Sequence, residues 1–195
     1  MSRWPFNSLG IFTVLLLVAG PITFAARQQT QVRNFRVVKH DVLYRSGQMS
    51  LDGLKRIVHE YGIRTVVSLR DKSHSGPNSA DEAEENYCAA QEIYFYRLPP
   101  QRWEAENRSD PAPVEENVRV FREIIDNPKH FPILIHCFAG IHRTGAYCAI
   151  YHMEKDHWTN NRAIADLEAS GYADIETDVL GYLRRYRPKW KGPPE

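Results

Sequence analysis

The sequence has few cysteines, no excess of charge of either sign, and no long apolar stretch after its first 26 residues. Three cysteines are too few for a disulfide-stabilised scaffold, and the odd number leaves at least one without an intramolecular partner. The 25 basic and 24 acidic side chains give a formal net charge of +1, so no overall positive field attracts nucleic acid or an anionic membrane surface. Any affinity for an anion must therefore be local.

Glycine and proline are not enriched either, with 11 and 12 residues, which excludes a collagen-like repeat and a low-complexity chain. A hydrophobic content of 43% is that of an ordinary globular protein, and it excludes both a disordered tail and a polytopic membrane protein. The length of 195 residues fits one domain of about 100–200 residues.

The first 26 residues differ from the rest of the chain. Arg3 is their only charged residue, and residues 9–20 form a continuous apolar run. Thr23 and Ala25 put small side chains at the third and first positions before a candidate cleavage site, as in a secretory signal peptide. Residues 9–26 are also mostly apolar and lie near the lower limit of about 17–25 residues for a membrane span, so an uncleaved anchor that tethers the chain to a membrane is the alternative. Both interpretations predict an extracytoplasmic domain, periplasmic or secreted, if the chain is bacterial.

Residues 35–187 are expected to form the folded domain, between a polar linker at 27–34 and a flexible tail at 188–195. β-Branched and aromatic runs predict strands at residues 35–38, 42–44, 63–69, 93–98 and 132–136. Amphipathic segments predict helices at residues 51–61, 79–91, 114–125, 144–158, 160–171 and 178–186. This alternation predicts a single α/β domain, with a central, mostly parallel sheet of about five strands flanked by helices.

Two of these helices carry capping residues. Ser50 precedes the first, and Gly62 follows its last apolar residue, as expected of an N-cap and a C-terminal glycine. Ser79 and Glu82 have the spacing of a capping box at the start of the second.

The most informative segment is residues 136–145, HCFAGIHRTG, between an expected strand and an expected helix. Its backbone must turn at the carboxyl edge of the sheet, where open α/β sheets bind ligands. A loop entering a helix there points backbone N–H groups inward, and the helix dipole adds partial positive charge. Gly140 lets the loop curl without a Cβ, and the guanidinium of Arg143 can hold two phosphoryl oxygens. We expect a phosphate group to be bound by Phe138, Ala139, Gly140, Ile141, His142 and Arg143.

Cys137 is the candidate nucleophile of this loop. The same dipoles and Arg143 are expected to lower the pKa of Cys137 well below about 8.5, because they stabilise a thiolate. A thiolate beneath a bound phosphate is already in line to attack it, and the Thr144 hydroxyl can donate to the sulfur and ease its departure afterwards. A cysteine six residues before an arginine is a weak signal alone, but Gly140, Thr144 and Gly145 make it specific. The alternative is a buried free cysteine beside a surface arginine.

HCFAGIHRTG resembles the active-site loop of the cysteine-dependent protein tyrosine and dual-specificity phosphatases. YRSGQ at residues 44–48 and the Leu69-Arg70 strand end are similar to segments of the compact, atypical dual-specificity phosphatases of plants, fungi and bacteria. The resemblance covers about residues 35–156. Plant and fungal members typically carry a lysine where this chain has Ile141, which argues against the highly phosphorylated inositol substrates of some of those relatives.

The resemblance implies a hydrolase without metal or cofactor that acts through a phosphocysteine intermediate, with Cys137 as nucleophile and Arg143 as phosphate ligand. Phosphoproteins, inositol phosphates and phosphoinositides are all candidate substrates. Two other functions stay open: a module that binds a phosphorylated ligand without hydrolysing it, and a rhodanese-like sulfur transferase. Fold resemblance alone cannot choose among them.

Cleavage of a phosphate monoester also needs an acid that protonates the leaving oxygen. The polar loop at residues 99–113 offers Asp110, 27 residues before the cysteine, and two alternatives, Glu104 and Glu106. We favour Asp110, although an aspartate before a proline is also an ordinary turn residue. Trp103 in the same loop either stacks on an aromatic substrate or packs in the core.

His136 is assigned a supporting role, because the family usually uses this position to brace the loop and a thiolate made by its loop needs no separate base. His142 either contacts phosphate or is solvated. The eight histidines and three cysteines show no metal-ligand spacing. Cys88 and Cys148 are expected in the core, and a reversible disulfide between Cys88 and Cys137 is a hypothesis for a protected resting state.

Overall fold

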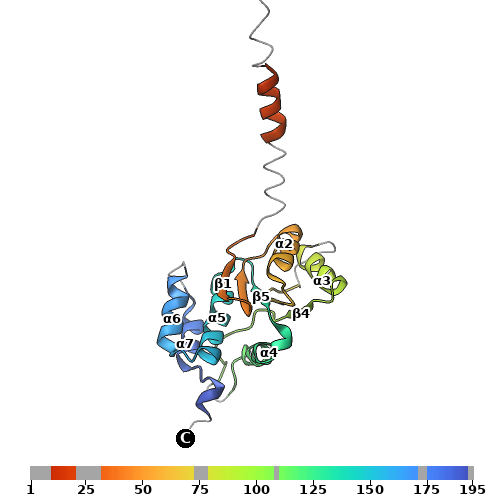
Figure 1. Cartoon of the computed structure of the whole chain (residues 1–195). Helices are drawn as coiled ribbons and strands as arrows, with labels where there is room; N and C mark the ends of the chain where they lie inside the picture. Colours follow the sequence, from red (N-terminus) through yellow and green to blue (C-terminus); the bar gives the residue numbers. More distant parts are fainter. Residues whose placement is uncertain (1–9, 21–31, 73–78, 108–109, 171–174, 193–195) are drawn as a thin grey trace, which may run out of the picture.

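The computed structural model describes residues 10–20, 32–72, 79–107, 110–170 and 175–192 (Figure 1). Its described strands form one sheet in the order β1-β2-β5-β3-β4. They are β1 (Arg36–Lys39), β2 (Leu43–Ser46), β3 (Thr65–Ser68), β4 (Tyr94–Arg97) and β5 (Ile133–His136). Only the β1–β2 pair is antiparallel, and the other three pairs are parallel. The prediction of an α/β domain with a mostly parallel sheet is confirmed.

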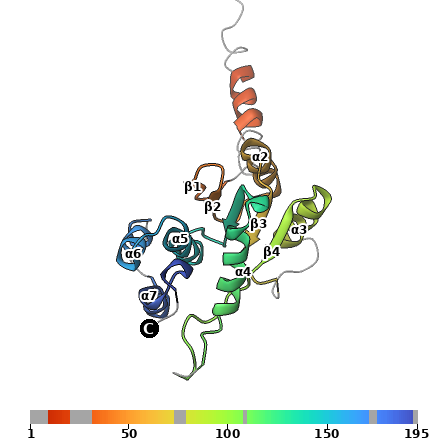
Figure 2. The same cartoon turned by 60° about the horizontal axis from the view of Figure 1, so that its bottom comes forward.

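Helices cover both faces of this sheet (Figure 2). The helices are α2 (Leu51–Tyr61), α3 (Ala80–Ala90), α4 (Glu115–Asp126), α5 (His142–Lys155), α6 (Asn160–Ala169) and α7 (Thr177–Arg185). Two short 3₁₀ turns are added at η1 (Pro128–His130) and η2 (Lys189–Lys191). Successive strand residues point to opposite faces, which divides the core into two clusters. The cluster facing α4 to α7 contains Leu43, Val67, Ile133 and Ile135, and the cluster facing α2 and α3 contains Tyr44, Val66 and Leu134.

The predicted caps are confirmed. The Ser50 side chain accepts a hydrogen bond from the Gly53 N–H, and Gly62 ends α2 in the left-handed conformation with a φ of 61°. Ser79 accepts from the Glu82 N–H at the start of α3.

Helix α5 begins two residues earlier than predicted and ends three residues earlier. At its start, the Gly145 N–H already donates to the Ile141 carbonyl at 2.7 Å, so the helix grows directly out of the cysteine-containing loop. At its end, Asp156 is the C-cap, and His157 adopts a left-handed backbone with a φ of 54° that cannot continue the helix.

Residues in the described parts of the expected linker and tail make hydrogen bonds to the domain. Asn34 donates from Nδ2 to the Ala139 carbonyl at 2.8 Å. In the tail, Trp190 donates from Nε1 to the Met153 carbonyl at 2.8 Å. Patterning missed both because the contacts come from isolated polar groups. Residues 27–31 and 193–195 lie outside the described residues.

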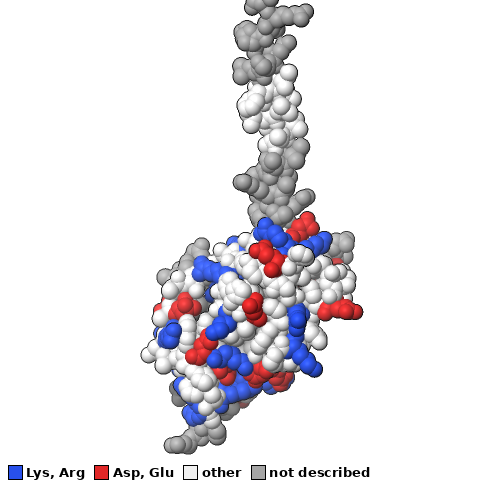
Figure 3. All heavy atoms as spheres, in the orientation of Figure 1, with Lys and Arg blue, Asp and Glu red and all other residues white. Residues whose placement is uncertain are grey.

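Near the N-terminus, residues 10–20 form a helix with exposed side chains. Within the described ranges, no helix combines the length and the apolar character needed to cross a membrane. The candidate cleavage residues Thr23 and Ala25 lie outside these ranges, so the signal peptide and the anchor both stay predictions. On the face of the molecule in Figure 3, basic and acidic side chains are interspersed, as the balanced composition suggests.

Candidate active site

Cys137 follows the last residue of β5, the central strand of the sheet, and residues 137–143 (the cysteine loop) lead into α5. The loop therefore lies at the carboxyl edge of the sheet between β2 and β3, as predicted. Cys137 is buried, with 3% of its surface exposed.

Carbonyl groups of the cysteine loop accept hydrogen bonds from outside the loop. The Gln48 N–H donates to the Phe138 oxygen at 3.1 Å, and Asn34 Nδ2 donates to the Ala139 oxygen at 2.8 Å. Arg45 Nη2 donates to the oxygens of both Gly140 and Ile141, at 2.9 and 3.2 Å. In a trans peptide the C=O and the following N–H point in opposite directions. Holding these four carbonyls outward therefore turns the N–H groups of the next residues toward the inside of the loop.

Two glycines allow the loop to lie directly on β2. Gly140 has a φ of 74°, and a Cβ added there would lie 2.2 Å from the backbone nitrogen of Gly47. A Cβ on Gly47 would lie 2.9 Å from the Ala139 oxygen. Both positions require glycine, because any side chain would push the two backbones apart. This contact explains why the YRSGQ segment accompanies the cysteine loop in the sequence.

Arg45 is the residue of that segment which sequence reasoning missed. It is 5% exposed, and besides the two loop carbonyls it donates from Nη1 to the Ser170 hydroxyl at 3.4 Å. A guanidinium is rarely this buried without partners. The sequence offered one signal that Arg45 is buried: it lies at the end of a β-rich run, within the YRSGQ segment that resembles the atypical dual-specificity phosphatases.

The surroundings of Cys137 favour its thiolate. Burial alone raises the pKa of Cys137, but hydrogen bonds from the Thr144 hydroxyl and N–H and from the Gly140 N–H, together with the charge of Arg143, lower the pKa below its ordinary value. The Gly140 nitrogen lies 3.2 Å from the sulfur. The Thr144 hydroxyl is buried, and its interaction with Cys137 is one of those that lower the pKa of the thiol.

Arg143 is held from β3. Its Nη1 donates to the carbonyl of Leu69, the residue after that strand, at 2.7 Å. A guanidinium has five N–H donors, so this bond fixes its orientation and leaves donors for two oxygens of an oxyanion. The Leu69-Arg70 strand end noted in the sequence thus supports the arginine of the loop.

His136 lies beneath the loop and pairs with a residue that the sequence did not single out. Its Nε2 is 2.8 Å from Oε1 of Glu84, and the two residues are 2% and 8% exposed. Burial lowers the pKa of His136, but the Glu84 carboxylate, together with a smaller contribution from Cys137, raises the pKa overall. The supporting role of His136 stays a prediction, now with a named partner.

The exposed edge of the loop carries an aromatic ring between two cations. Phe138 is 54% exposed, and the guanidinium carbons of Arg33 and Arg70 lie 5.0 and 5.4 Å from its ring centroid. Arg70 is fixed by a bidentate pair with Asp81, at 2.6 and 2.8 Å. His142, the first residue of α5, is also exposed. This edge can therefore contact an aromatic or an anionic part of a ligand.

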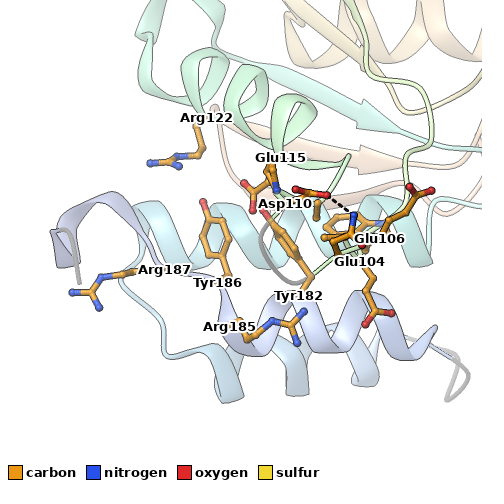
Figure 4. A pocket seen from close by; sticks show the side chains of 14 residues that line it. Glu104, Glu106, Asp110, Glu115, Arg122, Tyr182, Arg185, Tyr186 and Arg187 are labelled. Atoms are coloured by element: carbon orange, nitrogen blue, oxygen red, sulfur yellow. Dashed lines mark hydrogen bonds between the residues drawn. The ribbon is translucent and has the colours of Figure 1, made fainter. Parts of the chain in front are cut away.

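The three candidate acids line one pocket of about 830 Å³ between their loop, α4 and α7 (Figure 4). Asp110 is exposed and accepts a hydrogen bond from Asn107 Nδ2 at 2.8 Å, while Glu106 pairs with Arg102 at 2.6 Å. The described lining of this pocket includes Tyr182 and Arg122 but no residue of the cysteine loop. The role of Asp110 therefore stays a prediction.

Trp103 belongs to the core. It is 5% exposed, and its ring packs edge-on against Tyr147 and Tyr182 at centroid distances of 5.7 and 5.2 Å. Its burial favours the alternative in which it packs in the core.

Cys88 and Cys148 are buried free thiols, as expected. Burial raises the pKa of Cys88 to about 12 and that of Cys148 to about 11. Cys88 belongs to the cluster facing α2 and α3, whereas Cys137 belongs to the cluster on the other face. The sheet separates the two thiols, which argues against the proposed Cys88–Cys137 disulfide. Across the described part of the chain, no group of three or more His, Cys, Asp or Glu is placed to hold a metal ion.

Comparisons with known proteins agree with this geometry. A family model described as "DSP-PTPase phosphatase fused to NAD+ Kinase" matches residues 23–179. The dual specificity protein phosphatase TpbA of Pseudomonas aeruginosa (strain UCBPP-PA14) is 29% identical over 71 residues, which are 35% of this chain and 33% of TpbA. The match thus spans about a third of that relative's length.

Solved structures share the fold. The crystal structure of P. aeruginosa TpbA has a TM-score of 0.59 at 20% identity and covers 83% of this chain and 93% of TpbA. The core catalytic domain of the PP-IP phosphatase Siw14 from S. cerevisiae has a TM-score of 0.61 at 19% identity, covering 82% of this chain and 88% of that one.

Proposed function

The chain belongs to the DSP-PTPase phosphatase family, whose model matches residues 23–179, and on this basis we propose that it hydrolyses phosphate monoesters through a phosphocysteine intermediate. The observation that carries the proposal is the Cys137 thiol, with its pKa lowered, at the floor of a loop whose carbonyls are held outward. The same loop makes both the nucleophile and the anion-binding site.

In the first step the Cys137 sulfur attacks phosphorus and the bond from phosphorus to the ester oxygen breaks. The inward N–H groups and Arg143 stabilise the charge on the three equatorial oxygens. Asp110 protonates the departing oxygen, which leaves as an alcohol or phenol. This assignment requires the loop of Asp110 to approach the cysteine loop when substrate is bound.

In the second step a water molecule attacks the phosphorus of the phosphocysteine. The Asp110 carboxylate takes a proton from that water, the sulfur–phosphorus bond breaks, and inorganic phosphate is released. The Thr144 hydroxyl donates to the departing sulfur, which regenerates the thiolate. The buried, otherwise unpartnered position of this hydroxyl supports the assignment.

For the substrate, we propose an aryl phosphate such as phosphotyrosine in an acidic peptide. The exposed Phe138 ring can stack on a phenol ring, while Arg33 and Arg70 can pair with flanking carboxylates. TpbA has been solved in complex with pTyr. A second candidate is an inositol phosphate or phosphoinositide, because the same two cations suit a second phosphate. PTPMT1, a related fold, has been solved with PI(5)P.

A substrate panel tests this proposal. The full chain and Cys137→Ser are assayed on p-nitrophenyl phosphate, phosphotyrosine and phosphoserine peptides, PI(5)P and an inositol phosphate. We expect multiple turnovers on the aryl phosphates, none in Cys137→Ser, and a phosphorylated enzyme that can be trapped by acid quench. Phosphate binding without turnover would identify a binding module, and activity with thiosulfate and cyanide a sulfur transferase.

We also propose that the N-terminal segment, residues 1–26, exports the domain or tethers it to a membrane. Its support is the apolar run at residues 9–20 and the small residues Thr23 and Ala25. The intact mass of the protein, after expression in a bacterium and separation of the periplasm from membranes, distinguishes the two. A shortened periplasmic form supports a signal peptide, and full length in membranes an anchor. Full length in the cytosol would contradict both.

A further inference from the structure

Helix α3 directs two carboxylates into the interior of the domain. Asp81 and Glu84 are three residues apart, so they lie on one helix face, and they are only 2% and 8% exposed. Asp81 holds Arg70 at the exposed edge of the cysteine loop, and Glu84 holds His136 beneath it. One helix face thus supports the site at two points.

The Glu84–His136 contact is a buried ion pair, with 2.8 Å between Oε1 and Nε2. A buried carboxylate is costly unless it is paired, so Glu84 has a strong preference for a protonated imidazole. His136 is covalently joined to Cys137 and is the last residue of β5. The pair therefore includes the residue that immediately precedes the nucleophile, and the charge of Cys137 acts on the His136 imidazole.

The groups that face the His136 imidazole come from four elements. Glu84 faces it from α3, and Ser46 and Ser68 lie beside it in register on β2 and β3. Cys137 follows it in the cysteine loop, and its thiolate favours the imidazolium. Both serine hydroxyls are buried and neutral, so the charged partners in this set are Glu84 and the thiolate.

We propose that Glu84 is a positioning residue for the phosphatase reaction: it keeps His136, the chain neighbour of Cys137, as an imidazolium and so stabilises the thiolate. The inference rests on the proposed function in taking Cys137 as the nucleophile. His136 and Cys137 are neighbours in the chain, and the imidazolium and the thiolate stabilise each other electrostatically. Without the carboxylate, burial favours the neutral imidazole, and the thiolate loses this cation.

The test is the pH dependence of Cys137 alkylation by iodoacetate in the full chain, followed by mass spectrometry to assign the modified thiol. In Glu84→Gln, which keeps the shape but removes the charge, we expect the midpoint to rise by about one pH unit. Alkylation below both midpoints should then be roughly tenfold slower. The acidic limb of kcat/KM on p-nitrophenyl phosphate should move in the same direction.

Asp81→Asn is the matched control, since it removes a buried carboxylate one turn earlier on the same helix face. It should lower thermal stability and leave the alkylation midpoint in place. Glu84→Asp retains the charge and should recover part of the shift. An unchanged midpoint in folded Glu84→Gln, or the same shift in Asp81→Asn, would overturn the proposal.

If Glu84→Gln does not fold, His136→Gln provides a second route, because it removes the imidazolium itself. It should raise the midpoint by a similar amount, and an unchanged midpoint in this variant would also overturn the proposal. Alkylation requires no hydrolysis. A shifted midpoint in a protein that cleaves no phosphate ester would therefore refute the proposed function while leaving the role of Glu84 intact.

Discussion

Arg45 Nη2 donates a hydrogen bond to the Gly140 carbonyl oxygen at 2.9 Å, although 95 positions separate the two residues in the chain. The bond joins the end of β2 to the middle of the cysteine loop. Because the same nitrogen also binds the Ile141 carbonyl, the curvature of the loop depends on a side chain from another strand. The anion-binding geometry is thus a property of the sheet edge as well as of the loop sequence.

Arg45→Gln should therefore lose both stability and activity. We expect a decrease of about 2–4 kcal/mol in the free energy of unfolding, because buried carbonyls lose charged partners. We also expect a fall of at least about a hundredfold in kcat/KM, because the N–H groups lose their inward orientation. Urea denaturation and p-nitrophenyl phosphate kinetics measure the two effects. Arg36, exposed and paired in register with Arg45, offers the control Arg36→Gln, which should change neither.

Gly140→Ala should disable the loop, because the new Cβ would lie 2.2 Å from the Gly47 nitrogen at a φ of 74°. We expect loss of nearly all turnover and several kcal/mol of stability. Gly62→Ala has a similar φ of 61° but no atom within 4 Å of the new Cβ. Gly62→Ala should lower the free energy of unfolding by about 1 kcal/mol and leave kcat unchanged. Equal effects of the two substitutions would contradict the proposed contact between Gly140 and β2.

Cys137→Ser should abolish turnover of p-nitrophenyl phosphate, since an alcohol is not ionised where the thiol is. Arg143→Lys should lose most of the activity, because a lysine cannot hold two oxygens while bonded to the Leu69 carbonyl. Steady-state kinetics and binding of inorganic phosphate separate the two variants: Cys137→Ser should still bind phosphate, and Arg143→Lys should bind it more weakly. Normal activity in either would refute the mechanism.

Thr144→Ala should raise the pKa of Cys137, because the hydroxyl is one of the groups that lower it. With the pKa lowered in the native enzyme, alkylation by iodoacetate should reach its plateau below the usual range of a cysteine thiol, and in the variant the plateau should begin at higher pH. Hydrolysis of the phosphocysteine should also slow, so that phosphoenzyme accumulates. Thr144→Ser keeps the hydroxyl and should resemble the native enzyme in both measurements.

Asp110→Asn should slow hydrolysis more for poor leaving groups than for good ones. An alkyl phosphate needs a proton at the departing oxygen, whereas p-nitrophenolate leaves without one. We expect a loss of about 10²–10⁴-fold on the alkyl ester and much less on the aryl ester. Glu104→Gln and Glu106→Gln, in the same loop, are the controls. If one of them shows this leaving-group dependence and Asp110→Asn does not, the acid has been assigned to the wrong residue.

The features of this architecture that could be predicted are those that depend on local sequence patterns. β-Branched runs gave the five strands, Ser50 and Ser79 marked helix starts, and HCFAGIHRTG located the loop. Arg45 and Glu84 escaped prediction because hydrophobic periodicity treats a charged residue as exposed. Their burial depends on partners 95 and 52 positions away, and no local pattern records such pairs.

The acid loop marks the other limit of prediction. Asp110 was favoured because of its distance in sequence from Cys137. The structure places it with Glu104 and Glu106 at a pocket beside α4 and α7. Whether Asp110 can reach the leaving oxygen depends on the position of its loop once substrate is bound. Neither the sequence pattern nor the boundaries of the neighbouring helices specify that position. For Trp103, by contrast, burial in the core is enough to choose between its two expected roles.

The outward-held carbonyls of residues 138–141 have one more consequence. Their partners, Gln48, Asn34 and Arg45, all belong to the protein itself, so the orientation of the inward N–H groups does not depend on a bound ligand. Preformed donors recognise the tetrahedral anion, whichever molecule carries it. Free orthophosphate, the end product, meets the same donors as the incoming ester and competes with it. Discrimination among esters must then come from the residues around the mouth, and the catalyst will slow as its own product accumulates.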